Sequence, residues 1–225
     1  GWAALGRVDF RLADLGTLTL SGSYRSVGFG TLEERVNERS KEDFLQYDAA
    51  TSLDLGKLVP KKAAIQIPVY AGISKTISKP QYDPLDLDIK LKDKINSAKT
   101  SQDADSIRNQ AFDETTIKTV NFTNVKKNKT NGKKPQLWDV SNLDLNYNFT
   151  HQERTNPIIE LEDIKKTRAA VGYNYAPQPT FVEPFKRLIK SRSPWFALIK
   201  DFNFNYKPSL ISVKADVFRQ FGATR

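Results

Sequence analysis

Residues 7–25 read RVDFRLADLGTLTLSGSYR, and this stretch decides the fold. Positions 8, 10 and 12 are apolar while 7, 9 and 11 are charged, which is the period of a strand with one apolar face. Residues 13–16 carry the signals of a tight turn. A second alternation follows, with Leu18 and Leu20 on one face. Two long strands joined by a short turn predict a β-hairpin.

The same alternation recurs along the chain and predicts about nine strands in all. The further runs are residues 47–55, 63–73, 116–125, 143–150, 169–175, 202–206 and 211–217. Several of these runs are longer than the roughly 5–6 residues of an average strand in a globular protein. The pattern therefore predicts an all-β, antiparallel fold.

Alternation leaves two orientations open. In a soluble sandwich or barrel, the apolar face points inward and the polar face meets water. In a membrane barrel, the apolar face meets lipid and the polar face lines a wet lumen. Aromatic residues near strand ends fit the interfacial girdle of a membrane barrel; they are Trp2, Tyr24, Tyr47, Trp138, Tyr175 and Trp195.

The connections divide the chain into five parts. We expect a hairpin and two further strands in residues 1–75, and strands with a basic hairpin tip in residues 115–175. Residues 76–114 read as a polar, partly helical insertion, in which Thr100 with Asp103 forms a helix cap. Residues 176–200 are expected to be an amphipathic helical connection, and residues 201–225 a terminal strand pair.

Composition limits the class of protein. The 225 residues contain no Cys, which excludes disulfides and thiolate metal sites. No stretch approaches the 18 apolar residues of a transmembrane helix. The formal net charge is +9, and a lysine run surrounds the turn at Asn131-Gly132. That run could meet lipopolysaccharide phosphates or nucleic acid, but it lacks the aromatic residues that stack on bases, so a solvated hairpin tip is favoured; its members are Lys126, Lys127, Lys129, Lys133 and Lys134.

No catalytic or cofactor motif is present. His151 is the one histidine, and without a nucleophile-elbow motif it is expected to be an inert residue just after a strand. The acidic run Asp83–Asp88 lacks the order of an EF-hand calcium loop and favours a polar turn. We therefore expect neither an enzyme nor a bound cofactor, and leave open whether the acidic run binds a metal.

Several stretches resemble the SprA (Sov) family of type IX secretion and gliding-motility proteins. In the first hundred residues they are 28–36 (GFGTLEERV), 60–63 (PKKA), 67–70 (IPVY) and 80–89 (PQYDPLDLDI). In the tail they are 202–206 (FNFNY) and 218–221 (FRQF). The resemblance implies a segment of a large transmembrane β-barrel in the bacterial outer membrane, through which folded proteins are secreted.

With that resemblance, the apolar faces are predicted to be lipid-facing and the polar faces lumen-facing. The lipid-facing residues are Leu18, Leu20, Ile65, Ile67, Val69, Leu143, Leu145, Val213 and Val217. The lumen-facing residues are Thr19, Ser21, Asp144, Asn146, Lys214 and Asp216. The alternative is a soluble or periplasmic β-sandwich that binds glycan, lipopolysaccharide or protein, with the opposite orientation.

The resemblance also implies partners. They are the rest of the same barrel chain, an outer-membrane protein of the PorV type, a periplasmic plug protein, secreted cargo with a C-terminal sorting domain, and lipopolysaccharide. Nucleic acid is not expected among them. An isolated set of about nine strands could not lie in lipid alone, because each unpaired backbone group there costs several kcal/mol.

Overall fold

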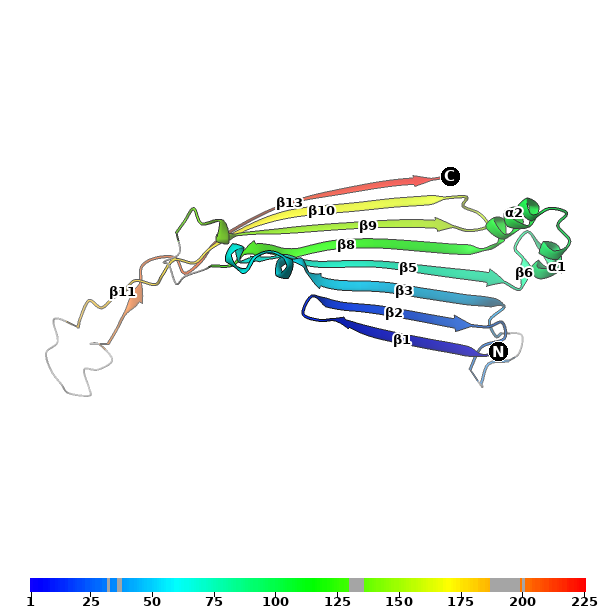
Figure 1. Cartoon of the computed structure of the whole chain (residues 1–225), viewed down its shortest axis with the longest axis horizontal. Helices are drawn as coiled ribbons and strands as arrows, with labels where there is room; N and C mark the ends of the chain where they lie inside the picture. The colour runs from blue at the N-terminus through cyan, green and yellow to red at the C-terminus, as the bar shows by residue number, and fades with distance from the viewer. Residues whose placement is uncertain (32, 36–37, 130–135, 187–198, 200) are drawn as a thin grey trace.

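The protein is one long, open antiparallel sheet with a small helical connection at one end (Figure 1). The structure is a computed structural model that describes residues 1–31, 33–35, 38–129, 136–186, 199 and 201–225. The sheet order is β1-β2-β3-β5-β8-β9-β10-β13, and the short β4 (Ile65–Gln66) pairs with the end of β8. The long strands are β1 (Ala3–Leu12), β2 (Gly16–Arg25), β3 (Glu42–Asp54), β5 (Pro68–Pro80), β8 (Asp113–Lys127), β9 (Leu143–Thr155), β10 (Glu162–Tyr175) and β13 (Ile211–Thr224).

Each long strand pairs with the long strand that follows it in the chain, so the sheet is an up-and-down meander. This confirms the predicted antiparallel β-fold with few helices. The sheet of the described residues is not closed: β1 and β13 are its two edges.

The predicted hairpin is present in the expected register. Val8 lies opposite Leu20 and Phe10 opposite Leu18. The turn has two positive backbone angles, at Ala13 (φ 48°) and at Gly16 (φ 155°). A side chain at Gly16 would also strike the backbone of Ser52 on β3, so this glycine allows both the turn and the close approach of the next strand.

Few side chains of the sheet are fully buried on either side. Among the described residues, the buried apolar side chains are Leu91, Ala111 and Ala170, and the buried polar ones are Asp83 and Asn142. Of these, only Ala170 belongs to a long strand of the sheet. The described residues thus form a single layer without the packed second layer that globular domains require.

The connection between β5 and β8 contains a short hairpin and two helices. They are β6 (Tyr82–Asp83), β7 (Asp86–Lys90), α1 (Leu91–Asn96) and α2 (Ser101–Ala111). The predicted cap is confirmed, because the Thr100 Oγ1 atom accepts a hydrogen bond of 3.1 Å from the Asp103 backbone N–H. None of the helices in the described part of the chain is long and apolar enough to cross a membrane.

The remaining connection, between β10 and β13, differs from expectation. Residues 181–182 form a two-residue strand, β11 (Phe181–Val182), where an amphipathic helix was expected. Residues 202–206 contain only β12 (Phe204–Asn205), which pairs with β11 and not with β13, so the terminal strand pair is absent. The Asn205 carboxamide oxygen accepts from the Lys207 N–H, and Pro208 cannot donate a ladder bond, so the run ends early.

Two predictions fall on residues outside the described part of the chain. They are the tip of the lysine run at residues 130–135, and most of the amphipathic stretch, at residues 187–198 and 200. Three short 3₁₀ segments complete the described elements: η1 (Leu55–Leu58), η2 (Lys61–Ala63) and η3 (Val140–Asn142).

Candidate functional site

The candidate site is the sheet itself, whose two faces differ in chemistry. Residues directly opposite each other in an antiparallel pair point to the same face. The register can therefore be followed across the whole sheet from Phe10 on β1. One such row is Phe10, Leu18, Thr51, Ala71, Val120, Phe149, Thr167 and Arg219.

One face carries most of the apolar side chains of the long strands, although a few, such as Leu5 and Phe218, lie on the other face. The register places seven of the residues predicted to face lipid on it: Leu18, Leu20, Val69, Leu143, Leu145, Val213 and Val217. Ile65 joins this face through its partner Lys127. Ile67, between β4 and β5, lines an apolar hollow of about 480 Å³ with Phe122 and Leu145 on the same face.

These apolar side chains are open to their surroundings. Val217 is 71% exposed, Val213 61% and Leu145 48%. A contiguous exposed apolar surface of this kind marks contact with lipid or with another protein. We call it the apolar belt: the apolar side chains of this face from β1 to β13.

The opposite face is polar and cross-linked between strands. The register places on it all six residues predicted to face a lumen: Thr19, Ser21, Asp144, Asn146, Lys214 and Asp216. Arg168 binds Asp216 on the next strand at 2.7 Å, and Asn174 donates to Asp144 at 2.8 Å. Hydrogen bonds of this kind satisfy the polar groups while leaving the face open to water.

Asn146 has a second role, which the alternation of apolar and polar residues along the strand did not indicate. Its side-chain oxygen accepts a 2.8 Å hydrogen bond from the backbone N–H of Asn124. Asn124 has a positive φ of 55° and lies in the irregularity between Phe122 and Val125, where β8 shifts its register against β9. Asn146 thus stabilises a β-bulge.

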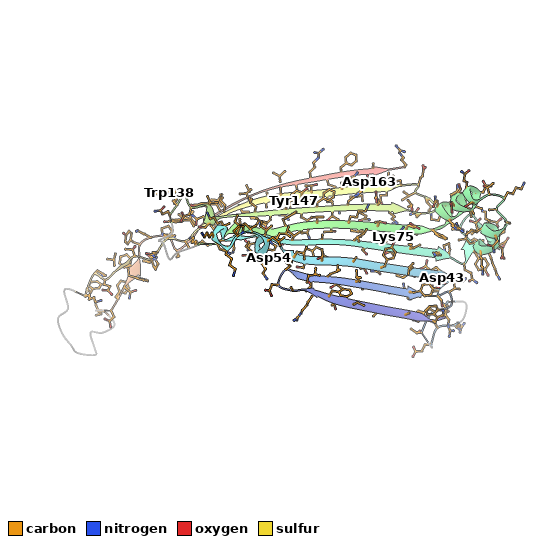
Figure 2. The ribbon with its side chains drawn as sticks, viewed as in Figure 1. Asp43, Asp54, Lys75, Trp138, Tyr147 and Asp163 are labelled. Atoms are coloured by element: carbon orange, nitrogen blue, oxygen red, sulfur yellow. The ribbon has the colours of Figure 1, made fainter. Side chains whose placement is uncertain are left out.

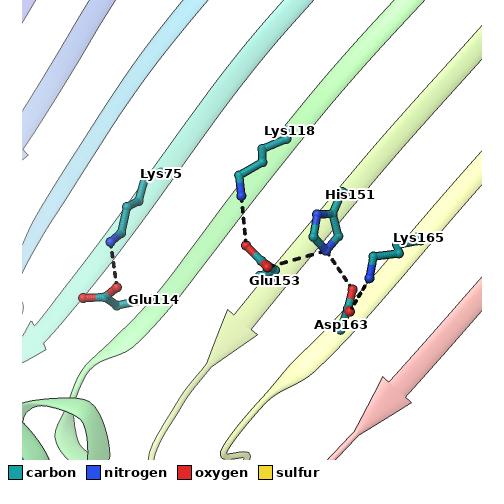
Figure 3. A network of polar contacts seen from close by, with 7 residues as sticks. All are labelled: Lys75, Glu114, Lys118, His151, Glu153, Asp163 and Lys165. Atoms are coloured by element: carbon teal, nitrogen blue, oxygen red, sulfur yellow. Dashed lines mark hydrogen bonds and ion pairs between the residues drawn. The ribbon is translucent and has the colours of Figure 1, made fainter.

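A row of charged residues crosses the apolar face near one end of the sheet (Figure 3). Lys75 pairs with Glu114 at 2.9 Å, Lys118 with Glu153 at 3.3 Å, and Lys165 with Asp163 at 2.8 Å. We call it the charged ladder: Lys75, Glu114, Lys118, His151, Glu153, Asp163 and Lys165.

His151 stands at the middle of this ladder. Its Nε2 atom lies 2.8 Å from the Asp163 carboxylate and 3.6 Å from that of Glu153. The expectation that His151 follows a strand was wrong, because β9 continues to Thr155. The alternation of faces continues through Phe149, His151 and Glu153. However, the residues on this face change from apolar to charged, so the hydrophobic pattern did not indicate that the strand continues.

The ladder marks one border of the apolar belt. On β8 the belt ends at Val120 and Lys118 follows, and on β9 it ends at Phe149 and His151 follows. The belt on β9 runs from Leu143 to Phe149, which is about 20 Å of strand at roughly 3.4 Å per residue. That length is of the order of the apolar band of a membrane barrel, about 25 Å.

Aromatic residues lie at both ends of the sheet. The Trp2 and Tyr24 rings lie 4.7 Å apart and tilted by 43°, at the end where the ladder lies. Trp138, 79% exposed, lies at the opposite end from Asp163 (Figure 2). Its turn is held by the Tyr173 hydroxyl, which donates to the Leu137 carbonyl at 2.6 Å, and Tyr173 belongs to the apolar face.

Asp83, the first residue of the acidic run, is engaged within the helical connection. Its carboxylate pairs with Lys94 and accepts from the Leu85 N–H at 3.1 Å. Burial alone would raise the pKa of Asp83, but these hydrogen bonds and the Lys94 charge hold it below its ordinary value. Within the described ranges, no group of three His, Asp or Glu side chains is placed to hold a metal ion.

Comparison with known protein families gives a match over residues 1–95, to the family SprA_N, described as a motility related/secretion protein. Residues 1–95 belong to the SprA_N family. The SprA_N segment comprises β1 to β7, η1, η2 and most of α1. No curated protein matches the chain.

The SprA_N match ends before β8, although the sheet does not. β8, β9, β10 and β13 continue the sheet of the SprA_N segment with the same division into an apolar and a polar face. The charged ladder links the two parts, since Lys75 lies within the match and Glu114 beyond it. The resemblance of the tail at residues 202–206 and 218–221 lies outside the match and stays a prediction.

Proposed function

We propose that this chain forms part of the wall of an outer-membrane β-barrel through which folded proteins are secreted. In this proposal, the apolar belt faces lipid and the polar face lines the aqueous conduit. The role is structural and conductive, and no residue performs catalysis. The SprA_N family supports a link to motility and secretion.

The exposed apolar belt is the observation that carries the proposal. Val217 is 71% exposed. Exposure of such apolar side chains to water is unfavourable, because removing each Å² of apolar surface from water contributes about 25 cal/mol of stability. In lipid the same surface carries no such cost, because the surrounding acyl chains are also apolar. Only helices and closed β-sheets can span a bilayer, because backbone groups must be paired there.

The polar face supports the aqueous side of the wall. Its charged residues, such as Asp48 on β3 and Lys214 on β13, lie on the same strands as the apolar belt. A bilayer could not solvate this face, whereas a water-filled lumen could. The alternation of the two chemistries fits a membrane-barrel wall as well as a sandwich, and the exposure of the apolar face favours the wall.

The open edges support a larger assembly. β1 and β13 each present one unpaired edge to their surroundings in the described structure. Unpaired strand edges cannot lie in hydrocarbon, so the proposal requires further strands beside both of them. These would come from the rest of the barrel.

Cysteine substitution on one strand tests the proposal. The chain contains no Cys, so the introduced thiol is the only one in it. In the full-length protein in its native membrane, with any Cys outside these 225 residues replaced by Ser, Leu20→Cys should resist a water-soluble maleimide, and a fluorophore attached there should be quenched by brominated lipid. Ser21→Cys, the next residue on the polar face, should react with the maleimide and escape the quencher.

The opposite result would support the soluble-sandwich alternative. In that case Leu20→Cys would escape both reagents because a second layer covers it, and the protein would remain in solution without detergent. Equal reaction of both thiols with the maleimide would contradict the proposal as well.

A further inference from the structure

The two ends of the apolar belt differ in charge. At one end the charged ladder pairs its lysines with carboxylates. At the other end lies a group of exposed lysines, which we call the lysine rim: Lys57, Lys61, Lys62, Lys127 and Lys129. The rim is brought together by a 2.6 Å hydrogen bond from the Asn128 N–H to the Ala64 carbonyl, which holds η2 beside the end of β8.

No ion pair neutralises the rim in the described residues, although Asp139 borders the same hollow as Lys127 and Lys129; its carboxylate accepts a 3.0 Å hydrogen bond from the Gln136 N–H. In the part of the chain that the structure describes, none of the five lysines forms an ion pair, and Lys57 donates only to the backbone carbonyl of Asp14. The residues outside that part contain no Asp or Glu. The nearby Asp54 carboxylate instead accepts backbone hydrogen bonds, from Gly56 and Ile67.

The rim continues the apolar face. Lys127 lies on that face two residues beyond Val125. Beside it, the exposed Trp138 lies in the turn held by the hydroxyl of Tyr173, another residue of the apolar face. A hollow of about 280 Å³ lies between Lys127, Lys129, Trp138 and Asp139. Exposed tryptophan next to lysine at the end of an apolar surface is typical of the level of lipid headgroups.

We propose that the lysine rim binds the phosphate groups of anionic lipids whose acyl chains cover the apolar belt. The inference rests on the proposed function, because it requires the belt to lie in lipid. The lysine ammonium groups donate to phosphate oxygens, and the Trp138 indole lies at the same level. The charged ladder does not share this role, since its carboxylates already engage its lysines.

The test compares two triple variants that each remove three positive charges. In the rim variant, Lys61, Lys127 and Lys129 are changed to Gln. In the control variant the changes are Lys90→Gln, Lys92→Gln and Lys99→Gln, at exposed positions in the helical connection. Each full-length protein is reconstituted in nanodiscs of phosphatidylcholine with a minor fraction of phosphatidylglycerol, extracted with mild detergent, and its retained lipids are counted by native mass spectrometry.

The rim variant should retain at least about fivefold less phosphatidylglycerol relative to phosphatidylcholine, the change expected for even one lysine near an anionic surface. The control variant should match the unmodified protein. Added inorganic phosphate, compared with chloride at equal ionic strength, should not displace the lipid. Equal retention by the rim variant would overturn the inference, and so would displacement by inorganic phosphate, because the ligand would then be free phosphate.

The Leu20→Cys quenching experiment separates this inference from the proposed function. Performed in the rim variant, it also shows that the variant has folded and inserted. Quenching at Leu20→Cys with unchanged lipid retention would contradict only the rim. Loss of quenching in the otherwise unmodified protein would contradict the proposed function, and the inference with it.

Discussion

The sheet and the helical connection at residues 81–112 obtain their stability from different sources. In the connection, Leu91 is 3% exposed and Asp83 2%, so this small region has a packed interior of its own. In the sheet, Val213 and Val217 are more than half exposed although they belong to a fourteen-residue strand. The two regions are adjacent in the chain, because the connection joins β5 to β8 of the sheet.

This difference teaches where the fold depends on its surroundings. Substitutions in the connection should have the same effect in detergent, in lipid or in water, because the interactions that they remove are internal. Substitutions in the apolar belt should have effects that depend on what covers it. The following predictions test this distinction.

The largest effect is expected for Leu145→Arg on β9. A charge on a lipid-facing side chain near the bilayer midplane costs about 2–4 kcal/mol. The measurement is the free energy of unfolding of the full-length protein in lipid bilayers, from urea titration. The matched change Thr119→Arg, on the polar face between Gly72 and Thr150, should alter it by less than about 0.5 kcal/mol. Equal losses at both positions would contradict the assignment of the faces.

Leu91→Ala should have the second largest effect, and it should be local. Removal of a buried leucine side chain costs about 2 kcal/mol or more. Hydrogen exchange at the backbone amides of α1 and α2 should accelerate accordingly, to the same extent in detergent and in lipid. Leu87→Ala, at a 75% exposed position of the same connection, should leave the exchange unchanged. Faster exchange throughout the sheet would show that the connection is not independent.

The smallest effect is expected from acid. Because the pKa of Asp83 is lowered in the folded protein, its ion pair with Lys94 contributes stability above the ordinary carboxyl pKa. This contribution is lost as pH falls through the lower, folded value. The protection factors of the α1 amides, which correct exchange for its intrinsic pH dependence, should therefore fall below about pH 4, and Asp83→Asn should reduce this acid dependence. An equal reduction in Asp88→Asn, an exposed neighbour, would contradict the role of Asp83.

The sequence predicted the local structure of the sheet well. The period of two identified the β1–β2 hairpin and placed residues such as Leu145 and Asn146 on opposite sides of one strand. The Thr100 cap was also predicted, because a cap is encoded within four residues.

The rest depended on contacts between distant residues. The charged ladder joins Lys75, Glu114 and Asp163, which are brought together only by the register of four strands. Charged residues interrupt the hydrophobic pattern, so the ends of β5, β8 and β9 were placed too early. The residues 202–206 alternate as a strand should, but alternation does not specify a partner, and β12 pairs outside the main sheet.

The strand order has a consequence for how such a wall could change in size. The chain crosses the sheet eight times along its long strands, so the start of β1 and the finish of β13 lie at the same end of the sheet (Figure 1). A unit with an even number of crossings can be inserted, duplicated or removed without reversing the direction of the neighbouring strands. In the proposed barrel, growth of the circumference by such paired crossings would keep every other loop on its own side of the membrane.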